Sequence, residues 1–339
     1  MTHLTYLEAA VVGLIQGVTE LFPISSLGHN VLLPAIVGGS WATDLNVAAA
    51  ESPYLAFIVG LHVATAIALL IYFWRDWVRI IRGFFASIGH VIRPDEGTAR
   101  WQLQTTDQKL AWMIIVATIP VGLVGLVFEH EFRVLFGKPI RAAIFLVING
   151  LILLAGEFFR RKASLQADRE IAQERELVAV GGARRAGGSR HAAGHQAERA
   201  AEYELGVESD RRLSAQGYLS AFLIGTAQIL ALLAGISRDG VAMVAGMFRG
   251  LSREDAARFA FLLATPVILA AGVLKVPDLM GPMGSGIRGQ ILVGSVLSGV
   301  GAYLSVRFLV RYFRTRTLTP FAIYCIVVGL GSVVYLSLR

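Results

Sequence analysis

Long apolar segments separated by short polar ones run through nearly all of this 339-residue chain. Hydrophobic residues make up 55% of the sequence and charged residues only 16%, against about 25% in a soluble domain, whose surface must be wetted. These proportions exclude most soluble folds and predict an all-α integral membrane protein. Six segments have the length of about 20 residues that crosses a hydrocarbon core about 30 Å thick: 52–73, 109–128, 140–159, 255–275, 287–306 and 320–338.

Two further apolar segments, residues 7–38 and 215–250, are interrupted near their middles by polar runs. The first run is Pro-Ile-Ser-Ser-Leu-Gly-His (23–29) and the second is Gly-Ile-Ser-Arg-Asp-Gly (235–240). We expect each segment to form a re-entrant helical hairpin that returns to the side it entered. Residues 1–8 hold no Lys or Arg ahead of the apolar run, so we expect the first segment to be retained and not cleaved as a signal peptide.

Lys and Arg in the short loops predict the orientation. Five lie in residues 74–108 and four in 307–319, but none lies in 39–51 or 276–287. Because cytoplasmic loops carry the excess of basic residues, we expect the first two loops inside, the C-terminus outside, and the two hairpins entering from opposite sides. The net charge of +7 therefore indicates orientation, and we expect no nucleic-acid partner.

The largest group of charged residues outside the spans lies in one insert. Residues 160–214 hold 11 basic and 9 acidic side chains, which predicts a solvated helix or a disordered loop on the cytoplasmic side. A second charged segment, the amphipathic stretch 75–92, carries Arg75, Arg79 and Arg82, which we expect to lie against anionic headgroups.

The insert separates two membrane repeats, residues 1–159 and 215–339. Each begins with a hairpin and continues with three spans, and several residues recur at a constant offset of 212. This pattern predicts an inverted-topology repeat, an architecture that places binding sites near the membrane midplane. The recurring pairs are Gly13 and Gly225, Gln16 and Gln228, Ile24 and Ile236, Ser25 and Ser237, and Gly28 and Gly240.

Irregular backbone at membrane depth is tolerated only where protein buries it or water reaches it, so both polar runs should line a cavity. Ionisable groups in such a place are functional candidates by default. A carboxylate, hydroxyls, an imidazole and an arginine that converge there favour phosphoryl transfer on a lipid phosphate. The candidates are Gln16, Glu20, Ser25, Ser26 and His29 in the first hairpin, and Gly235, Ser237, Arg238, Asp239 and Gly240 in the second.

Structural roles are the alternatives for several of these residues. Ser25 is favoured as the cap of the helix that follows Pro23, whereas Ser26 is open to either role. His29 could be a purely structural imidazole, and Arg238 could pair only with Asp239. His62, in the middle of a span, is expected to make a structural hydrogen bond, with a role facing the site left open.

The two polar runs and their flanking residues resemble the motifs of a known family. The run QGVTELFPISSLGH (16–29) resembles the first motif of the bacterial undecaprenyl-diphosphate phosphatases, the bacitracin-resistance family, and AGISRDG (234–240) resembles the second. Residues 61–65, 117–122 and 259–266 are also similar to the family. The resemblance covers nearly the whole chain except the insert, and two separated motifs in the right order make it specific.

The resemblance implies removal of the terminal phosphate of undecaprenyl diphosphate, which recycles the lipid carrier for cell-wall synthesis in the bacterial plasma membrane. It implies Ser26 or His29 as nucleophile or acid/base, with Ser26 favoured as the attacking group. It also implies Glu20 as base or metal ligand and Arg238 as the diphosphate clamp. Gln16, Ser25, Ser237, Gly235 and Gly240 are the expected substrate-binding residues.

The second motif departs from the family pattern, because Ala234, Asp239 and Ala242 replace Pro, Ser and Thr; in the first motif Leu27 replaces a Thr that is often present. One hypothesis is that Asp239 and Glu20 together hold a divalent cation, Mg²⁺ or Ca²⁺; no organic cofactor is expected. The runner-up function is a flippase or carrier for polyprenyl phosphates with a decayed catalytic site. A homodimer is left open.

Overall fold

The computed structural model describes residues 4–45, 53–92, 103, 105–136, 138–178, 195–281 and 286–339. Within these ranges the secondary structure is helical, and no strand is present, as the sequence predicts. In chain order the helices are α1 (Tyr6–Thr19), α2 (Ser26–Val37), α3 (Ser40–Asp44), α4 (Pro53–Tyr72), α5 (Trp74–Ile92), α6 (Thr106–Phe136), α7 (Pro139–Val178), α8 (His195–Ser214), α9 (Gly217–Ala227), the 3₁₀ helix η1 (Gln228–Leu232), α10 (Arg238–Phe248), α11 (Arg253–Met280), α12 (Arg288–Thr315) and α13 (Thr319–Ser337).

Five helices, α6, α7, α11, α12 and α13, are long and apolar enough to cross a membrane, or up to seven spans if each of two bent helix pairs counts as one. These five match five of the predicted spans. The sixth, 52–73, is α4, which meets α5 at a bend of 85°. Large apolar side chains such as Leu123, Leu292 and Val327 point outward on these helices, as a lipid-facing surface requires. The chain is therefore a multi-pass membrane protein.

Both interrupted segments fold as short helices joined by a break. In the first, Pro23 follows the end of α1, and Ser25 caps α2 by accepting a hydrogen bond from the Gly28 N–H at 3.2 Å. In the second, Ser237 caps α10 in the same way, accepting from the Gly240 N–H at 3.1 Å. The predicted meeting of the two tips is confirmed, because the Gly235 N–H donates to Ser25 Oγ at 3.2 Å.

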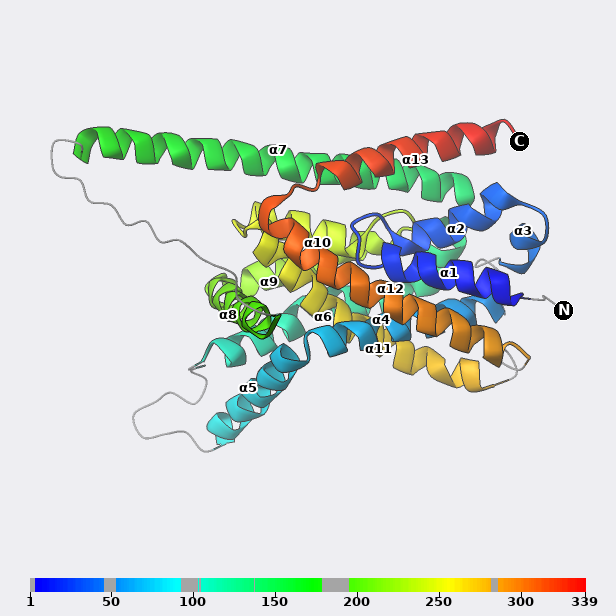
Figure 1. The fold of residues 1–339 in the computed structure, drawn as a ribbon, viewed down its shortest axis with the longest axis horizontal. Helices are drawn as coiled ribbons and strands as arrows, with labels where there is room; N and C mark the ends of the chain where they lie inside the picture. Colours follow the sequence, from blue (N-terminus) through cyan, green and yellow to red (C-terminus); the bar gives the residue numbers. More distant parts are fainter. Residues whose placement is uncertain are drawn as a thin grey trace.

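The two hairpins open toward opposite ends of the molecule. At the end of α2, the Ile36 carbonyl accepts from Tyr335 Oη at 3.3 Å, which places this end beside the C-terminus. At the open end of the other hairpin, Arg249 Nε donates to Ser220 Oγ at 3.1 Å. In Figure 1 both chain termini lie at the right of the view, while α8 and α5 lie toward the left.

Asn149 joins the two tips near the middle of the apolar part of α7, Pro139–Lys162. Its Nδ2 donates to the Pro23 carbonyl at 2.9 Å, and its Oδ1 accepts from the Ser237 N–H at 2.9 Å. The two tips therefore lie beside the middle of this apolar span.

Glycines that match at the offset of 212 make matching close contacts. A Cβ added to Gly13 in α1 would lie 2.4 Å from the Gly294 carbonyl of α12. A Cβ added to Gly225 in α9 would lie 2.0 Å from the Ala117 carbonyl of α6. Each hairpin therefore packs backbone to backbone against a span. The inverted relation between the halves stays a prediction.

A buried ion cluster corrects two expectations from the sequence. Arg79 does not face headgroups, because it donates to Asp107 at 2.7 Å, to Asp76 at 3.2 Å and to Asp210. Arg258 Nε also donates to Asp210, at 2.9 Å. The end of α8 is therefore only partly solvated: Asp210 is fully buried between two arginines, whereas Arg211 and Arg212 are exposed. Residues 179–194 of the predicted insert lie outside the described residues.

Candidate active site

A cavity of about 310 Å³ lies between the hairpin tips and is walled by α4, α6 and α11. Its polar lining residues are Glu20, Ser25, Ser26, His62, Gln228, Ser237 and Arg238. The rest of the lining is mostly apolar and includes Val31, Ile58, Val121, Leu232 and Ile268. A cavity with one polar end and apolar walls fits a ligand with a charged head and a hydrocarbon tail.

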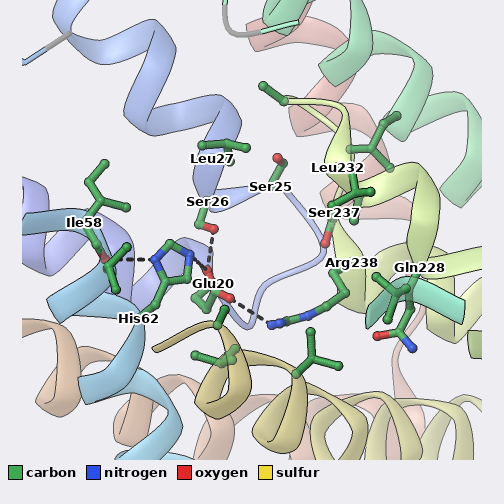
Figure 2. Close-up of a pocket in the computed structure, with 18 of the residues that line it drawn as sticks. Glu20, Ser25, Ser26, Leu27, Ile58, His62, Gln228, Leu232, Ser237 and Arg238 are labelled. Carbon is green, nitrogen blue, oxygen red and sulfur yellow. Dashed lines mark hydrogen bonds and ion pairs between the residues drawn. The ribbon is translucent and has the colours of Figure 1, made fainter. Parts of the chain in front are cut away.

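Glu20 is the centre of the polar cluster (Figure 2). Its Oε2 accepts from Gln16 Nε2 at 2.8 Å and from the Ser26 hydroxyl. Its Oε1 accepts from Arg238 Nη2 at 2.8 Å. The carboxylate is buried, so these charged and polar partners are what stabilise its charge.

Ser26 is held in place by the residue before it. Ser25 has a φ of 68°, in the left-handed region that side-chain-bearing residues rarely adopt, and such strain is typical of functional sites. The Ser25 hydroxyl accepts two N–H bonds, from Gly28 and Gly235, which is the capping role expected from the sequence. The Ser26 hydroxyl instead points to the Glu20 carboxylate, the arrangement of a nucleophile beside its base.

Arg238 completes the cluster from the second hairpin. Besides Glu20 it contacts Asp239, with Nε 3.4 Å from Oδ1, so it bridges two carboxylates. Ser26 and Arg238 are the first residues of α2 and α10, so both helices point their positive ends toward the cavity. Two helix N-termini and a guanidinium suit a phosphate group.

The two histidines take different positions. His62 of α4 lies in the cavity wall, with Nε2 3.3 Å from Glu20 Oε2 and Nδ1 2.9 Å from the Ile58 carbonyl. His29 is not among the cavity residues: its Nδ1 contacts the Ser25 carbonyl at 2.7 Å and its Nε2 contacts Tyr324 Oη at 2.8 Å. The structure thus brings His62, and not His29, to the carboxylate.

Four other predicted residues lie outside the cavity lining and surround the Glu20 cluster. Gln16 is fully buried between Glu20 and Asn30, whose Nδ2 donates to Gln16 Oε1 at 2.7 Å. Gly235 and Gly28 meet backbone to backbone, since a Cβ on Gly28 would lie 2.9 Å from the Gly235 Cα. Gly240 supplies the N–H that Ser237 caps. Asp239 is 1% exposed, and its Oδ2 has no hydrogen-bond partner among the described residues.

Three residues with polar roles at the tips were missed or undervalued by sequence reasoning. Asn149 was missed, although a lone amide in the middle of an apolar span is a signal that could have identified it. Gln228 appears in the sequence only as the repeat partner of Gln16. His62 shares the lone-polar signal, but sequence alone could not show which histidine faces Glu20.

These features define a multi-pass membrane protein that gathers a hydroxyl, a carboxylate and an arginine in a cavity at membrane depth. The family model described as bacitracin resistance protein BacA matches residues 9–331. The chain belongs to this family.

Among curated relatives, the undecaprenyl-diphosphatase of Mycolicibacterium paratuberculosis is 56% identical and aligned over 99% of both chains. Undecaprenyl-diphosphatase 2 of Frankia alni is 53% identical over 97% of both chains. The undecaprenyl-diphosphatase of Granulibacter bethesdensis is 37% identical over 97% of this chain and 96% of its own.

Proposed function

We propose that this protein is a membrane phosphatase that hydrolyses undecaprenyl diphosphate to undecaprenyl phosphate and inorganic phosphate. In this role it recycles the lipid carrier for cell-wall synthesis in the plasma membrane and confers resistance to bacitracin. The observation that carries the proposal is the convergence of Ser26, Glu20 and Arg238 in a cavity with apolar walls. The names of the full-length relatives support it.

The first step is attack by Ser26 on the terminal phosphorus. As the Ser26 oxygen bonds to phosphorus, its proton passes to Glu20, which already accepts the hydroxyl hydrogen bond. The bond from phosphorus to the bridging oxygen breaks, and its electron pair leaves with undecaprenyl phosphate. Arg238 balances the charge on the phosphate oxygens.

The second step frees the enzyme. Water attacks the phosphorus of the Ser26 phosphate ester, and Glu20 returns its proton to the departing Ser26 oxygen. Both protons of the water leave on inorganic phosphate, as H₂PO₄⁻, so atoms and charge balance. His62 and Gln16 hold the Glu20 carboxylate toward Ser26 in both steps.

A divalent cation, Mg²⁺ or Ca²⁺, held by Glu20 and Asp239 is part of the proposal. Among the described residues there is no group of three or more His, Cys, Asp or Glu side chains suited to a metal ion. Two carboxylates still fit, because Mg²⁺ is commonly bound by one or two carboxylates together with substrate phosphates. The unpartnered Asp239 Oδ2 is available as a ligand. When bound, the cation would neutralise charge on the diphosphate.

The tips meet beside the middle of α7, and Gly13 and Gly225 make matching close contacts with spans. These observations support the further proposal that the halves form an inverted repeat with the site between them. The hydrocarbon chain of the substrate lies along the apolar wall formed by α6 and α11, which includes Val121 and Ile268.

Phosphate release tests the proposed function. Purified wild-type protein in detergent is mixed with undecaprenyl diphosphate, and inorganic phosphate is measured with Mg²⁺ present or chelated. The proposal predicts release with multiple turnovers. Binding of the lipid without release would instead favour a carrier for polyprenyl phosphates.

A further inference from the structure

Gln228 lies in the cavity but takes no part in the hydrogen-bond cluster around Glu20. It is the C-cap residue of α9 and the first residue of η1, where the helix tightens to 3₁₀ geometry. It lines the cavity and is 1% exposed. In Figure 2 the Gln228 side chain lies on the far side of Arg238 from Ser26, and its amide points away from the guanidinium.

Both polar atoms of this amide lack partners. Neither Nε2 nor Oε1 of Gln228 has a hydrogen-bond partner among the described residues, and both atoms are buried. A buried amide without partners destabilises the fold, so a residue kept in this state needs another explanation, such as a ligand. The other polar side chains of the cavity lining each have at least one hydrogen bond or ion pair.

Its repeat partner shows what a structural glutamine looks like in this fold. Gln16 is also buried, but it donates to Glu20 at 2.8 Å and accepts from Asn30 at 2.7 Å. The same residue type at the matching position is therefore satisfied in the first hairpin and unsatisfied in the second.

We propose that Gln228 is a substrate-binding residue whose Nε2 donates to the phosphate group attached to the lipid, the one that stays on the leaving group. This inference rests on the proposed function. With the terminal phosphate held by Arg238 beside Ser26, the second phosphate of a diphosphate extends away from Ser26, toward the side of the cavity that Gln228 lines. Ala231 and Leu232, the last two residues of η1, line the same cavity and then contact the start of the hydrocarbon tail.

Binding to a variant that cannot turn over tests the assignment. In a Ser26→Ala background, dissociation constants are measured by calorimetry for farnesyl diphosphate, farnesyl monophosphate and inorganic phosphate, with and without Gln228→Leu. We expect Gln228→Leu to weaken both farnesyl ligands about tenfold and to leave inorganic phosphate unchanged. Gln228→Glu, which replaces the NH₂ donor by a charged oxygen, should weaken them at least as much.

Thermal stability separates a binding role from a structural one. Without ligand, Gln228→Leu should unfold at the same or a higher temperature than its parent, because it removes an unsatisfied buried amide. Gln16→Leu, the matched control, should unfold at a lower temperature because it removes the hydrogen bonds that Gln16 makes with Glu20 and Asn30.

Two results would overturn the inference. One is unchanged binding of farnesyl diphosphate by Gln228→Leu, which together with a lowered unfolding temperature would indicate a structural role. The other is equal weakening of inorganic phosphate. That result would place Gln228 at the terminal phosphate. Phosphate release by the wild-type protein is measured separately, because it tests the proposed function and not the binding site. If release fails while the farnesyl ligands still depend on Gln228, the proposed function is wrong and the binding site stands.

Discussion

Arg238 of the second hairpin donates a hydrogen bond from Nη2 to Glu20 Oε1 of the first at 2.8 Å, across 218 positions of sequence. The same guanidinium contacts Asp239, so one cation serves two buried carboxylates. The contact joins the two hairpins at the proposed binding site of the substrate head.

Arg238→Lys should lower kcat/KM for undecaprenyl diphosphate on the order of 10²-fold while the protein still folds. Lysine keeps the charge but cannot span Glu20, Asp239 and a phosphate with one planar fork. The measurement is phosphate release at several substrate concentrations, with circular dichroism as the control for folding. Activity within about threefold of wild type would show that a point charge is enough.

The two histidines give a matched pair of variants. His62→Gln should reduce kcat on the order of 10²-fold, because His62 lies 3.3 Å from the proposed base. His29→Gln should change kcat little, since His29 contacts the Ser25 carbonyl and Tyr324 outside the cavity lining. The reverse order of effects would restore His29 as the acid/base group implied by the resemblance.

Close helix contacts at the repeat glycines predict matching losses of stability. Gly13→Ala and Gly225→Ala should each lower the free energy of unfolding by about 1–3 kcal/mol, because the new Cβ meets a backbone carbonyl. Gly122→Ala is the control, since a Cβ there has no neighbour within 4 Å. Equal stability of all three proteins would contradict the close packing of hairpin on span.

Asp239→Ser tests the proposed cation site. Loss of one of two carboxylate ligands should raise the Mg²⁺ concentration for half-maximal phosphate release on the order of tenfold. Asp44→Ser, at the last residue of the short helix α3, serves as a charge-matched control. An unchanged Mg²⁺ dependence for Asp239→Ser would remove Asp239 from the metal site.

The spans and the hairpin breaks were predictable because both depend on local sequence. About twenty apolar residues favour a span in any context, and Pro23 with Ser25 both ends one helix and caps the next. The meeting of Glu20 with Arg238 followed from the repeated motif, which placed both polar runs at similar depth.

Tertiary packing decided the features that the sequence left open. His29 and His62 both lie in apolar segments, and only the approach of α4 to the first hairpin selects His62. Arg79 sits on a basic amphipathic helix, which normally indicates a membrane surface. The bend between α4 and α5 instead points it at Asp210, a residue 131 positions away.

The central claim is that Ser26 attacks the terminal phosphate with Glu20 as base. The most direct measurement is phosphate release from undecaprenyl diphosphate by Ser26→Ala, together with the dissociation constant of the same lipid. We predict that release falls by at least about 10³-fold while binding stays within about threefold of wild type. Release by Ser26→Ala at a rate near that of the wild-type protein would contradict the account.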